Sequence, residues 1–283
     1  MNELKQHISC PERLPLALFD CFADRVDNKI QNRLVSELMS KYAEASKKLD
    51  ESNKKLFDYS LHLEELVQKK TREMTASKIA VIHALVKLSE SRDEDTGAHI
   101  ERTSGYCRLL AQKAWEHGIY KGQLDEPYIE NIEKASPLHD IGKVGIVDAI
   151  LLKPGRLTDE EFEIMKTHVL HGYNTLSSVE KTHPTNRFVR LGMEISKYHH
   201  EKWDGSGYMG GLSGEDIPLS ARIMAIADVY DALRSKRVYK EAFSHKKSVE
   251  IMAEGRKKHF DPLLIDIFFR HQEQFCQIYE ANA

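Results

Sequence analysis

The hexapeptide Leu138-His139-Asp140-Ile141-Gly142-Lys143 places an imidazole beside a carboxylate, directly before a segment prone to turn. A second stretch, from Tyr198 to Tyr208, places His199 and His200 before a segment that also contains glycine. Imidazole and carboxylate together suit first-row divalent ions such as Mn, Fe, Co, Ni and Zn. These two stretches therefore predict a metal site.

The whole-chain composition excludes several classes of protein. A formal net charge of −3 over 283 residues leaves no basic footprint for DNA or RNA. Four cysteines without a C-x-x-C pair favour neither a disulfide framework nor a zinc ribbon, and they are typical of a reducing cytoplasm. The apolar run near the start, Leu14 to Phe19, is too short to span a membrane. We expect a soluble, cytoplasmic protein without a membrane partner.

The first quarter of the chain differs from the rest. Residues 1–28 are too few for a domain and could be the edge of a sensory module. Residues 29–76 favour a helical stalk, because residues 30–75 contain no Gly or Pro. Apolar or small residues there recur at alternating spacings of three and four, which predicts a coiled-coil seam and a homodimer. The alternative is one amphipathic helix packed on its own domain. The seam positions are Val35, Leu38, Tyr42, Ala45, Leu49, Ser52, Leu56, Tyr59, Leu63 and Leu66.

Residues 77–283 predict an all-α domain with almost no strand signal. The Thr158–Glu161 segment is a capping box, so a helix should begin there and carry His168. One segment, Val144–Leu152, could be extended before the turn Lys153-Pro154-Gly155. Further helices are predicted over residues 79–88, 100–110, 128–136, 188–198, 221–233 and 248–278.

Seven side chains are candidate metal ligands: His99, His139, Asp140, His168, His199, His200 and Asp228. Neighbouring helical side chains diverge by about 100°, so an adjacent pair clasps one ion only at a crossing, or else serves two ions. Seven ligands exceed what one octahedral ion accepts, and a bridging Asp140 would suit two ions. A two-metal site fits hydrolysis of a phosphoester.

Three basic residues are candidate phosphate contacts. Lys143 follows Asp140 by three residues, although a solvated surface lysine would have the same spacing. Arg237 and Lys240 could clamp a phosphate, or they could only favour the dipole of the preceding helix. A purely structural role for the histidines would require a separate hydrogen-bonding explanation for each buried ring.

Residues 77–275 resemble the HD-GYP family of metal-dependent phosphohydrolases. The blocks that carry the resemblance are Arg92-Asp93 with Thr96-Gly97 and His99, His139-Asp140-Ile141-Gly142-Lys143, Leu152-Lys153-Pro154-Gly155 with His168, His199-His200-Glu201 with Asp204 and Gly207-Tyr208, Ile217-Pro218, Ala221-Arg222-Ile223, Asp228-Val229-Tyr230-Asp231, and Arg237 with Tyr239-Lys240.

The resemblance implies an all-α fold and hydrolysis of cyclic di-GMP to pGpG or GMP, with two or three Fe or Mn ions. It implies that the seven candidates are metal ligands and that Lys143 faces the phosphate. Tyr208, Arg237 and Lys240 would hold the substrate. The stalk is similar to linkers that join an upstream sensory domain to this catalytic domain.

Two positions depart from the family pattern. The family's Gly-Tyr-Pro reads Gly207-Tyr208-Met209, so the turn lacks proline's fixed φ. Asp95 stands where members with a third metal have Glu, which leaves a two-metal and a three-metal site both open. Two alternatives remain, namely hydrolysis of cyclic GMP-AMP and a non-hydrolysing sensor that docks a diguanylate cyclase.

Overall fold

The computed structural model describes residues 28–90, 97–208, 211–236 and 241–282. Across these ranges the chain is helical and contains two isolated bridges but no β-strand, which confirms the all-α prediction. The chain divides into two compact units, Met1–Met74 and Thr75–Ala283. Residues 1–27, expected as a short N-terminal segment, lie outside the described ranges. Within those ranges no helix has both the length and the apolar character that a membrane span requires.

The first described element is α2, a 63-residue helix from Asn28 to Glu90, so the predicted long helix is confirmed. Ion pairs one turn apart support it, for example Lys48 with Glu44 at 2.6 Å. Four leucines of the seam are 60–63% exposed, namely Leu38, Leu49, Leu56 and Leu63. The pairing of this seam with a second helix stays a prediction.

The last turns of α2 belong to the second unit and contribute to its interior. Val86 is 1% exposed and clusters with Ile100, Leu138 and Leu176. Leu138 directly precedes His139, so this small cluster lies against the segment that carries the first metal-capable pair. The end of α2 is therefore part of the support of that segment.

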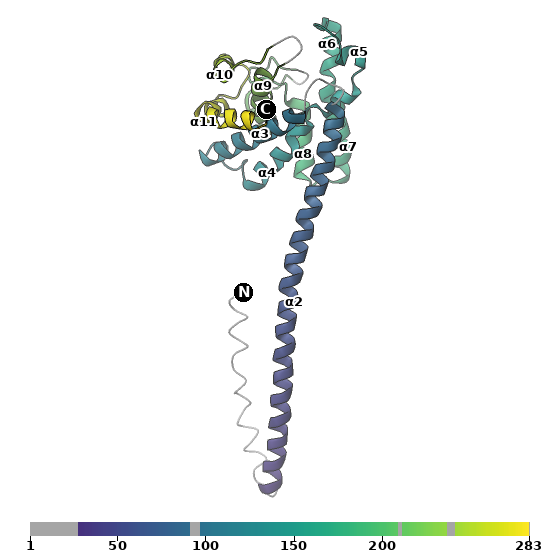
Figure 1. The fold of residues 1–283 in the computed structure, drawn as a ribbon, viewed down its shortest axis with the longest axis vertical. Helices are drawn as coiled ribbons and strands as arrows, with labels where there is room; N and C mark the ends of the chain where they lie inside the picture. The colour runs from purple at the N-terminus through teal and green to yellow at the C-terminus, as the bar shows by residue number, and fades with distance from the viewer. Residues whose placement is uncertain (1–27, 91–96, 209–210, 237–240, 283) are drawn as a thin grey trace. The chain divides into compact units, whose positions relative to one another are not determined.

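The main core of the second unit lies among its central helices (Figure 1). It contains a cluster of aromatic rings, in which Tyr106, Tyr230, Phe268 and Phe275 are fully buried with centroids 4.8–5.8 Å apart. Burying such rings contributes much of the stability of a helical domain. The helices are α3 (Gly97–Glu116), α4 (Glu126–Ala135), α8 (Arg187–Tyr198), α9 (Leu219–Arg234), α10 (His245–Glu254) and α11 (Pro262–Ala281), with the short η2 (Gly214–Asp216) before α9.

Two sequence predictions of local structure were wrong. Val144–Leu152 is not extended, because η1, a 3₁₀ helix, runs from Ser136 to Gly145 and α5 follows from Asp148 to Leu151. Ile146 and Ile150 are both buried while Asp148 between them is exposed, which fits a helical turn and not the alternation of a strand. The predicted helix over 248–278 is interrupted, because α10 ends at Glu254 and α11 begins at Pro262.

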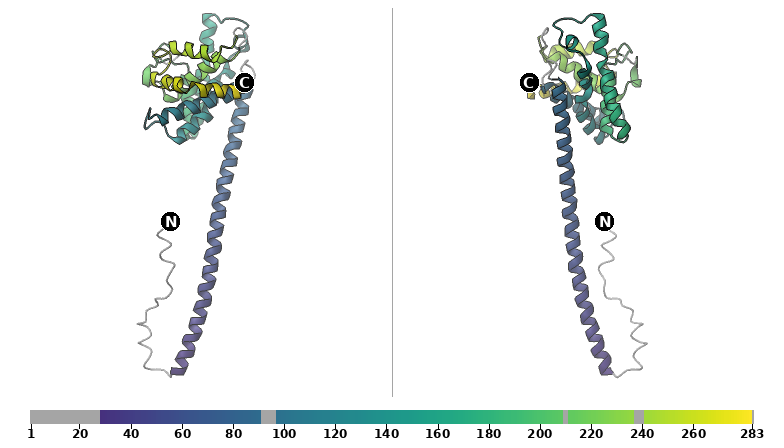
Figure 2. Two further views of the ribbon diagram at one scale, coloured as in Figure 1. Left: turned by 60° about the vertical axis from the view of Figure 1, so that its left-hand side comes forward. Right: turned by 90° about the vertical axis from the view of Figure 1, so that its right-hand side faces the viewer.

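The capping box is present as predicted and starts α6, which runs from Asp159 to Lys166. The chain then begins a new helix, α7, at His168 and continues to Thr182. His168 is thus the first residue of α7 rather than an interior residue of α6. Helices α7 and α8 lie side by side and both pack on η1 (Figure 2). This packing brings three of the metal-capable segments together.

Candidate metal centre

Close packing holds His139 and Asp140 against α7. A Cβ atom on Gly142 would lie 1.9 Å from the carbonyl oxygen of His168, and one on Gly172 would lie 2.1 Å from the Ser196 hydroxyl. Glycine at both positions lets η1, α7 and α8 approach more closely than any side chain would allow. The distance from Asp140 to the histidines of the neighbouring helices depends on this approach.

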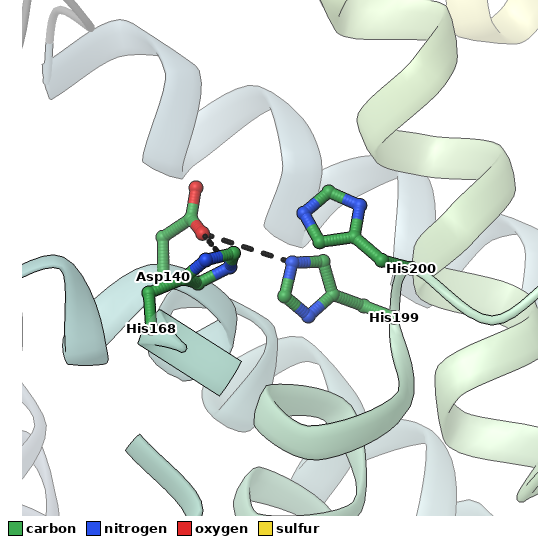
Figure 3. A group of neighbouring side chains, drawn as sticks. All are labelled: Asp140, His168, His199 and His200. Atoms are coloured by element: carbon green, nitrogen blue, oxygen red, sulfur yellow. Dashed lines mark ion pairs between the residues drawn. The ribbon is translucent and has the colours of Figure 1, made fainter. Parts of the chain in front are cut away.

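Asp140, His168, His199 and His200 form one group of potential ligands (Figure 3). The Asp140 Oδ1 atom lies 3.2 Å from His168 Nε2 and 3.7 Å from His199 Nε2. All three atoms are buried, and none has a partner that meets hydrogen-bond geometry. Buried polar atoms without such partners are rare, and converging ones are typical of a cation site.

His99, His139 and Asp228 form a second group of potential ligands. His99 Nε2 lies 3.4 Å from His139 Nε2, and His139 Nε2 lies 3.3 Å from Asp140 Oδ2. Asp140 therefore presents one oxygen to each group. This is the position that the sequence predicted for a bridging carboxylate.

Hydrogen bonds at Nδ1 orient four of the histidines. His139, His168 and His199 donate to the carbonyl oxygens of Ser136, Met165 and Ile195, at 2.8–2.9 Å. His99 instead donates to the Asp231 carboxylate at 2.8 Å. A proton on Nδ1 leaves the Nε2 lone pair for a metal, and such outer partners fix the tautomer and direction of a ligand.

The adjacent pair His199-His200 serves a single group. We expected helical neighbours to diverge, but α8 ends at Tyr198 and His199 is its C-cap. Because His200 lies beyond the helix, its ring turns back, with centroids 4.0 Å from His199 and 4.5 Å from Tyr208. Because the helix ends at this pair, the two adjacent histidines can face the same group of donors.

The electrostatics of the first group favour the protonation states that bind metal. Burial raises the pKa of Asp140, but the neighbouring Lys143 and His139 outweigh it, so its pKa lies well below the usual range. Burial, reinforced by His199, holds the pKa of His200 well below its usual value. A carboxylate and neutral imidazoles are the forms that coordinate a cation.

A cavity of about 410 Å³ opens beside the first group. Lys143 lies at its edge, with Nζ 3.0 Å from Asp140 Oδ2. Tyr208 also lines the cavity and contacts Phe162 of α6 edge to face, with centroids 5.7 Å apart. Apolar side chains complete much of the wall, namely Leu151, Met165, Val229, Ala232 and Leu233. Polar and apolar side chains thus line the same cavity.

Some of the predicted site residues lie outside the described ranges, and two residues at the site were not predicted. Asp95, Met209, Arg237 and Lys240 lie outside the described residues. Asp231, the partner of His99, was not among the predicted site residues, although its place three residues after Asp228 was a signal. His259 lines the cavity, and no local sequence pattern pointed to it.

The donor set fits divalent metal ions. The His and Asp donors form two groups of three or more residues, and within each group the ligand atoms lie within 4.8 Å of one another. Nitrogen and carboxylate oxygen donors without thiolate suit Mn, Fe, Co, Ni or Zn. Several buried Nε2 and Oδ1 atoms of the site have no hydrogen-bond partner. Binding a cation would satisfy these atoms, whereas a purely structural role would leave them unsatisfied.

The pattern of the HD-domain family matches residues 99–264, a span that begins at the first candidate ligand. Two relatives from Vibrio cholerae are 47% identical over 81% of the chain and 50% identical over 73% of it. They are named a probable cyclic di-GMP phosphodiesterase and a cyclic di-GMP phosphodiesterase. A third, a 3'3'-cGAMP-specific phosphodiesterase from the same species, is 40% identical over 70% of the chain.

These similarities concern only part of each relative. The chain spans 52%, 42% and 35% of the three proteins, about half of their length or less. The family match itself covers more than half of this chain and contains all seven candidate ligands. The chain therefore belongs to the HD-domain family.

Proposed function

We propose that this chain is a metal-dependent phosphodiesterase that hydrolyses cyclic di-GMP to pGpG or GMP in bacterial second-messenger signalling. The observation that carries the proposal is Asp140, whose two oxygens face two separate groups of donors at the edge of one cavity. The relatives named as cyclic di-GMP phosphodiesterases support this choice of substrate.

The chain's own residues have separate roles in this proposal. The seven His and Asp side chains hold the ions, which when bound would activate water and neutralise phosphate charge. Lys143, beside Asp140, supplies a positive charge in the cavity, where a phosphodiester would lie. Tyr208 contacts the substrate from the cavity wall, and we assign Arg237 and Lys240 the same task from the family resemblance.

We propose two ions, Fe or Mn, because the donors separate into two groups. A third ion would require Asp95. Metal analysis of protein purified without oxygen tests this count, and the Asp95→Ala variant separates two ions from three. One ion per chain at full activity would contradict the two-metal proposal.

The decisive test uses the Asp140→Ala variant beside the wild type. After incubation with cyclic di-GMP and Fe or Mn without oxygen, chromatography should find pGpG or GMP only with the wild type. The variant should also lose metal, because it removes a ligand of both groups. Asp159→Ala, an exposed carboxylate at the start of α6, is the control and should retain both properties. Full activity of the Asp140 variant would exclude this mechanism.

Cyclic GMP-AMP is the second candidate substrate, and the relative named for it supports this alternative. A panel of cyclic dinucleotides at equal concentration decides between them through kcat/KM. A third possibility is a sensor that binds without hydrolysis and docks a diguanylate cyclase. Tight nucleotide binding by the metal-loaded protein without any product would favour it.

We also propose that the chain forms a homodimer through α2 and works in the cytoplasm under an upstream sensory partner. The exposed leucines of the seam support the dimer. The free thiols of Cys107 and Cys276 fit a reducing compartment.

A further inference from the structure

His259 lies in the turn between α10 and α11 and lines the cavity beside residues of α9. Among its neighbours in the cavity wall are Val229 and Leu233, which are apolar, and Asp228, which belongs to the second donor group. His259 belongs to neither donor group. A cavity-lining histidine that is not part of the metal cluster requires another explanation.

Backbone hydrogen bonds fix this turn from two directions. The Gly255 carbonyl accepts from the backbone N–H groups of His259 and Phe260, at 2.8 and 3.1 Å. The His259 carbonyl accepts from Trp203 N–H at 3.1 Å, which ties the turn to the loop that carries Tyr208. Because these bonds use only main-chain atoms, a substitution of the His259 side chain leaves them in place.

The residues that follow His259 anchor the turn in the core. Phe260 is buried, and Asp261 caps α11 by accepting from the N–H groups of Leu263 and Leu264. Asp261 also pairs with the buried Arg222 at 2.6 Å. The backbone that carries the His259 ring is thus held in place before any ligand arrives, which reduces the entropy lost on binding.

The His259 ring stacks flat on Phe260, with centroids 4.4 Å apart and an angle of 6° between the planes. Burial, together with the nearby positive charge of Lys202, lowers the pKa of His259 to about 4. The ring is therefore neutral at pH 7 and offers no charge to a phosphate. A flat, neutral ring beside apolar side chains suits a nucleobase instead.

We propose that His259 is a substrate-binding residue whose imidazole packs against one nucleobase of the cyclic dinucleotide. The phosphodiester then lies toward Lys143 and Asp140, which line the same cavity. This assignment rests on the proposed function, since it presumes that the cavity takes a nucleotide. It divides the cavity into an end that binds phosphate and a wall that binds a base.

The test compares two ligands that differ by the nucleoside. Manganese-loaded wild type, His259→Ala and His259→Phe are titrated calorimetrically with GMP and with inorganic phosphate. His259→Ala should weaken GMP binding about tenfold, the effect of losing one contact between a base and a ring, and leave phosphate binding unchanged. His259→Phe keeps a flat ring and should bind GMP within about threefold of the wild type. His271→Ala, a histidine of α11 that does not line the cavity, is the control and should match the wild type.

Metal content and thermal melting are measured for each variant. The ratio of GMP affinity to phosphate affinity within one variant does not depend on the fraction of folded protein. Unchanged GMP binding in His259→Ala, an equal loss for both ligands, or loss of metal would each overturn the assignment.

Failure of the proposed function has a different signature. Titration requires no turnover, so a chain that bound GMP through His259 without hydrolysing cyclic di-GMP would retain this inference and lose only the activity. In a chain that does hydrolyse the substrate, His259→Ala should raise KM more than it lowers kcat.

Discussion

Four histidines of the candidate site are anchored through Nδ1, three on backbone carbonyls and one on a side chain. His99 is the exception, because its acceptor is Asp231. Asp231 also accepts from Arg102 Nε at 2.6 Å, and the two side chains are 1% and 7% exposed. Burial would raise the pKa of Asp231, but its bonds to Arg102 and His99 outweigh it and hold the pKa below the usual value. One carboxylate therefore both neutralises a buried guanidinium and orients a candidate ligand.

Replacing Asp231 with Asn should cost about 3 kcal/mol of the free energy of unfolding, because it leaves the buried Arg102 charge without its counter-ion. Metal affinity should fall roughly 10- to 100-fold as His99 loses its charged partner. Urea unfolding and metal titration measure the two effects. The control is Asp266→Asn at the exposed pair with Arg256, where the loss should stay below about 1 kcal/mol. Equal losses in the two variants would refute the role of Asp231.

Glu194 of α8 is a partly buried carboxyl, which accepts from the Ser220 hydroxyl at 2.6 Å. Burial raises the pKa of Glu194 above 4.5. The pKa of this carboxyl is therefore higher in the folded state than in the unfolded state. At a pH between these two pKa values the folded carboxyl keeps its proton while the unfolded one has lost it, so the free energy of unfolding falls as the pH rises through this range. Glu194→Gln does not titrate, and its Oε1 can still accept from Ser220.

The Glu194→Gln variant should therefore match the wild type near pH 4 and become more stable than it as the pH approaches 7. Chemical denaturation at several pH values measures the difference. Glu160→Gln is a control of opposite sign, because backbone and Thr158 hydrogen bonds lower the pKa of the exposed Glu160. A difference between Glu194→Gln and the wild type that stays constant with pH would contradict the prediction.

At the scale of elements, the contact of η1 with α7 sets the geometry of the site. Gly142 faces the first turn of α7, and the atoms that an added Cβ would meet are backbone atoms, His168 O at 1.9 Å and Gly172 N at 2.5 Å. Backbone of packed helices cannot move aside as a flexible side chain can. Asp140 and His168 would separate if this contact opened.

Gly142→Ala should lower the free energy of unfolding by about 3 kcal/mol or more, because it overpacks a rigid contact. It should also reduce metal loading by separating Asp140 from His168. Thermal melting and metal analysis follow both effects. Gly105→Ala in α3 is the control, because its Cβ would meet only the end of the Ile278 side chain at 3.1 Å. A melting temperature of Gly142→Ala close to that of Gly105→Ala would show that the contact is not rigid.

At the scale of the whole molecule, the chain combines a long helix with a helical domain in two compact units. The heptad spacing of α2 is self-complementary, as a symmetric dimer requires. The last turns of α2 contact Leu138 through Val86 within the second unit. A change in the pairing of α2 would thus have a physical route to the segment that carries His139.

Sedimentation velocity at micromolar concentration should find a dimer for the wild type and a monomer for the double variant Leu56→Gln, Leu63→Gln, because both leucines lie on the seam. Leu61→Gln replaces an exposed leucine outside the seam and should remain dimeric. A monomeric wild type would refute the dimer. The metal content of the monomeric variant then shows whether the second unit requires dimerisation to bind metal.

Local residue types and spacing were enough to predict the all-α class, the long helix and the capping box at Thr158. These features depend on interactions within a few residues, such as the Thr158 and Glu161 hydrogen bonds. Chemistry at the residue level also identified the metal-capable side chains, since few roles other than cation binding suit adjacent His and Asp. The extended segment at 144–152 was wrong because it is too short for its apolar spacing to separate a strand from a helical turn.

Only the tertiary structure decided which candidate donors lie together and what surrounds them. The sequence by itself determined the set of candidate ligands, because a side chain's capacity to bind a metal is a matter of its own chemistry. Their division into two groups around Asp140 depends on packing at Gly142 and Gly172 and on the end of α8 at Tyr198. The anchoring of His99 by Asp231 and the place of His259 in the cavity wall join segments far apart in the chain. Such contacts follow from how whole helices pack, and no local pattern encodes them.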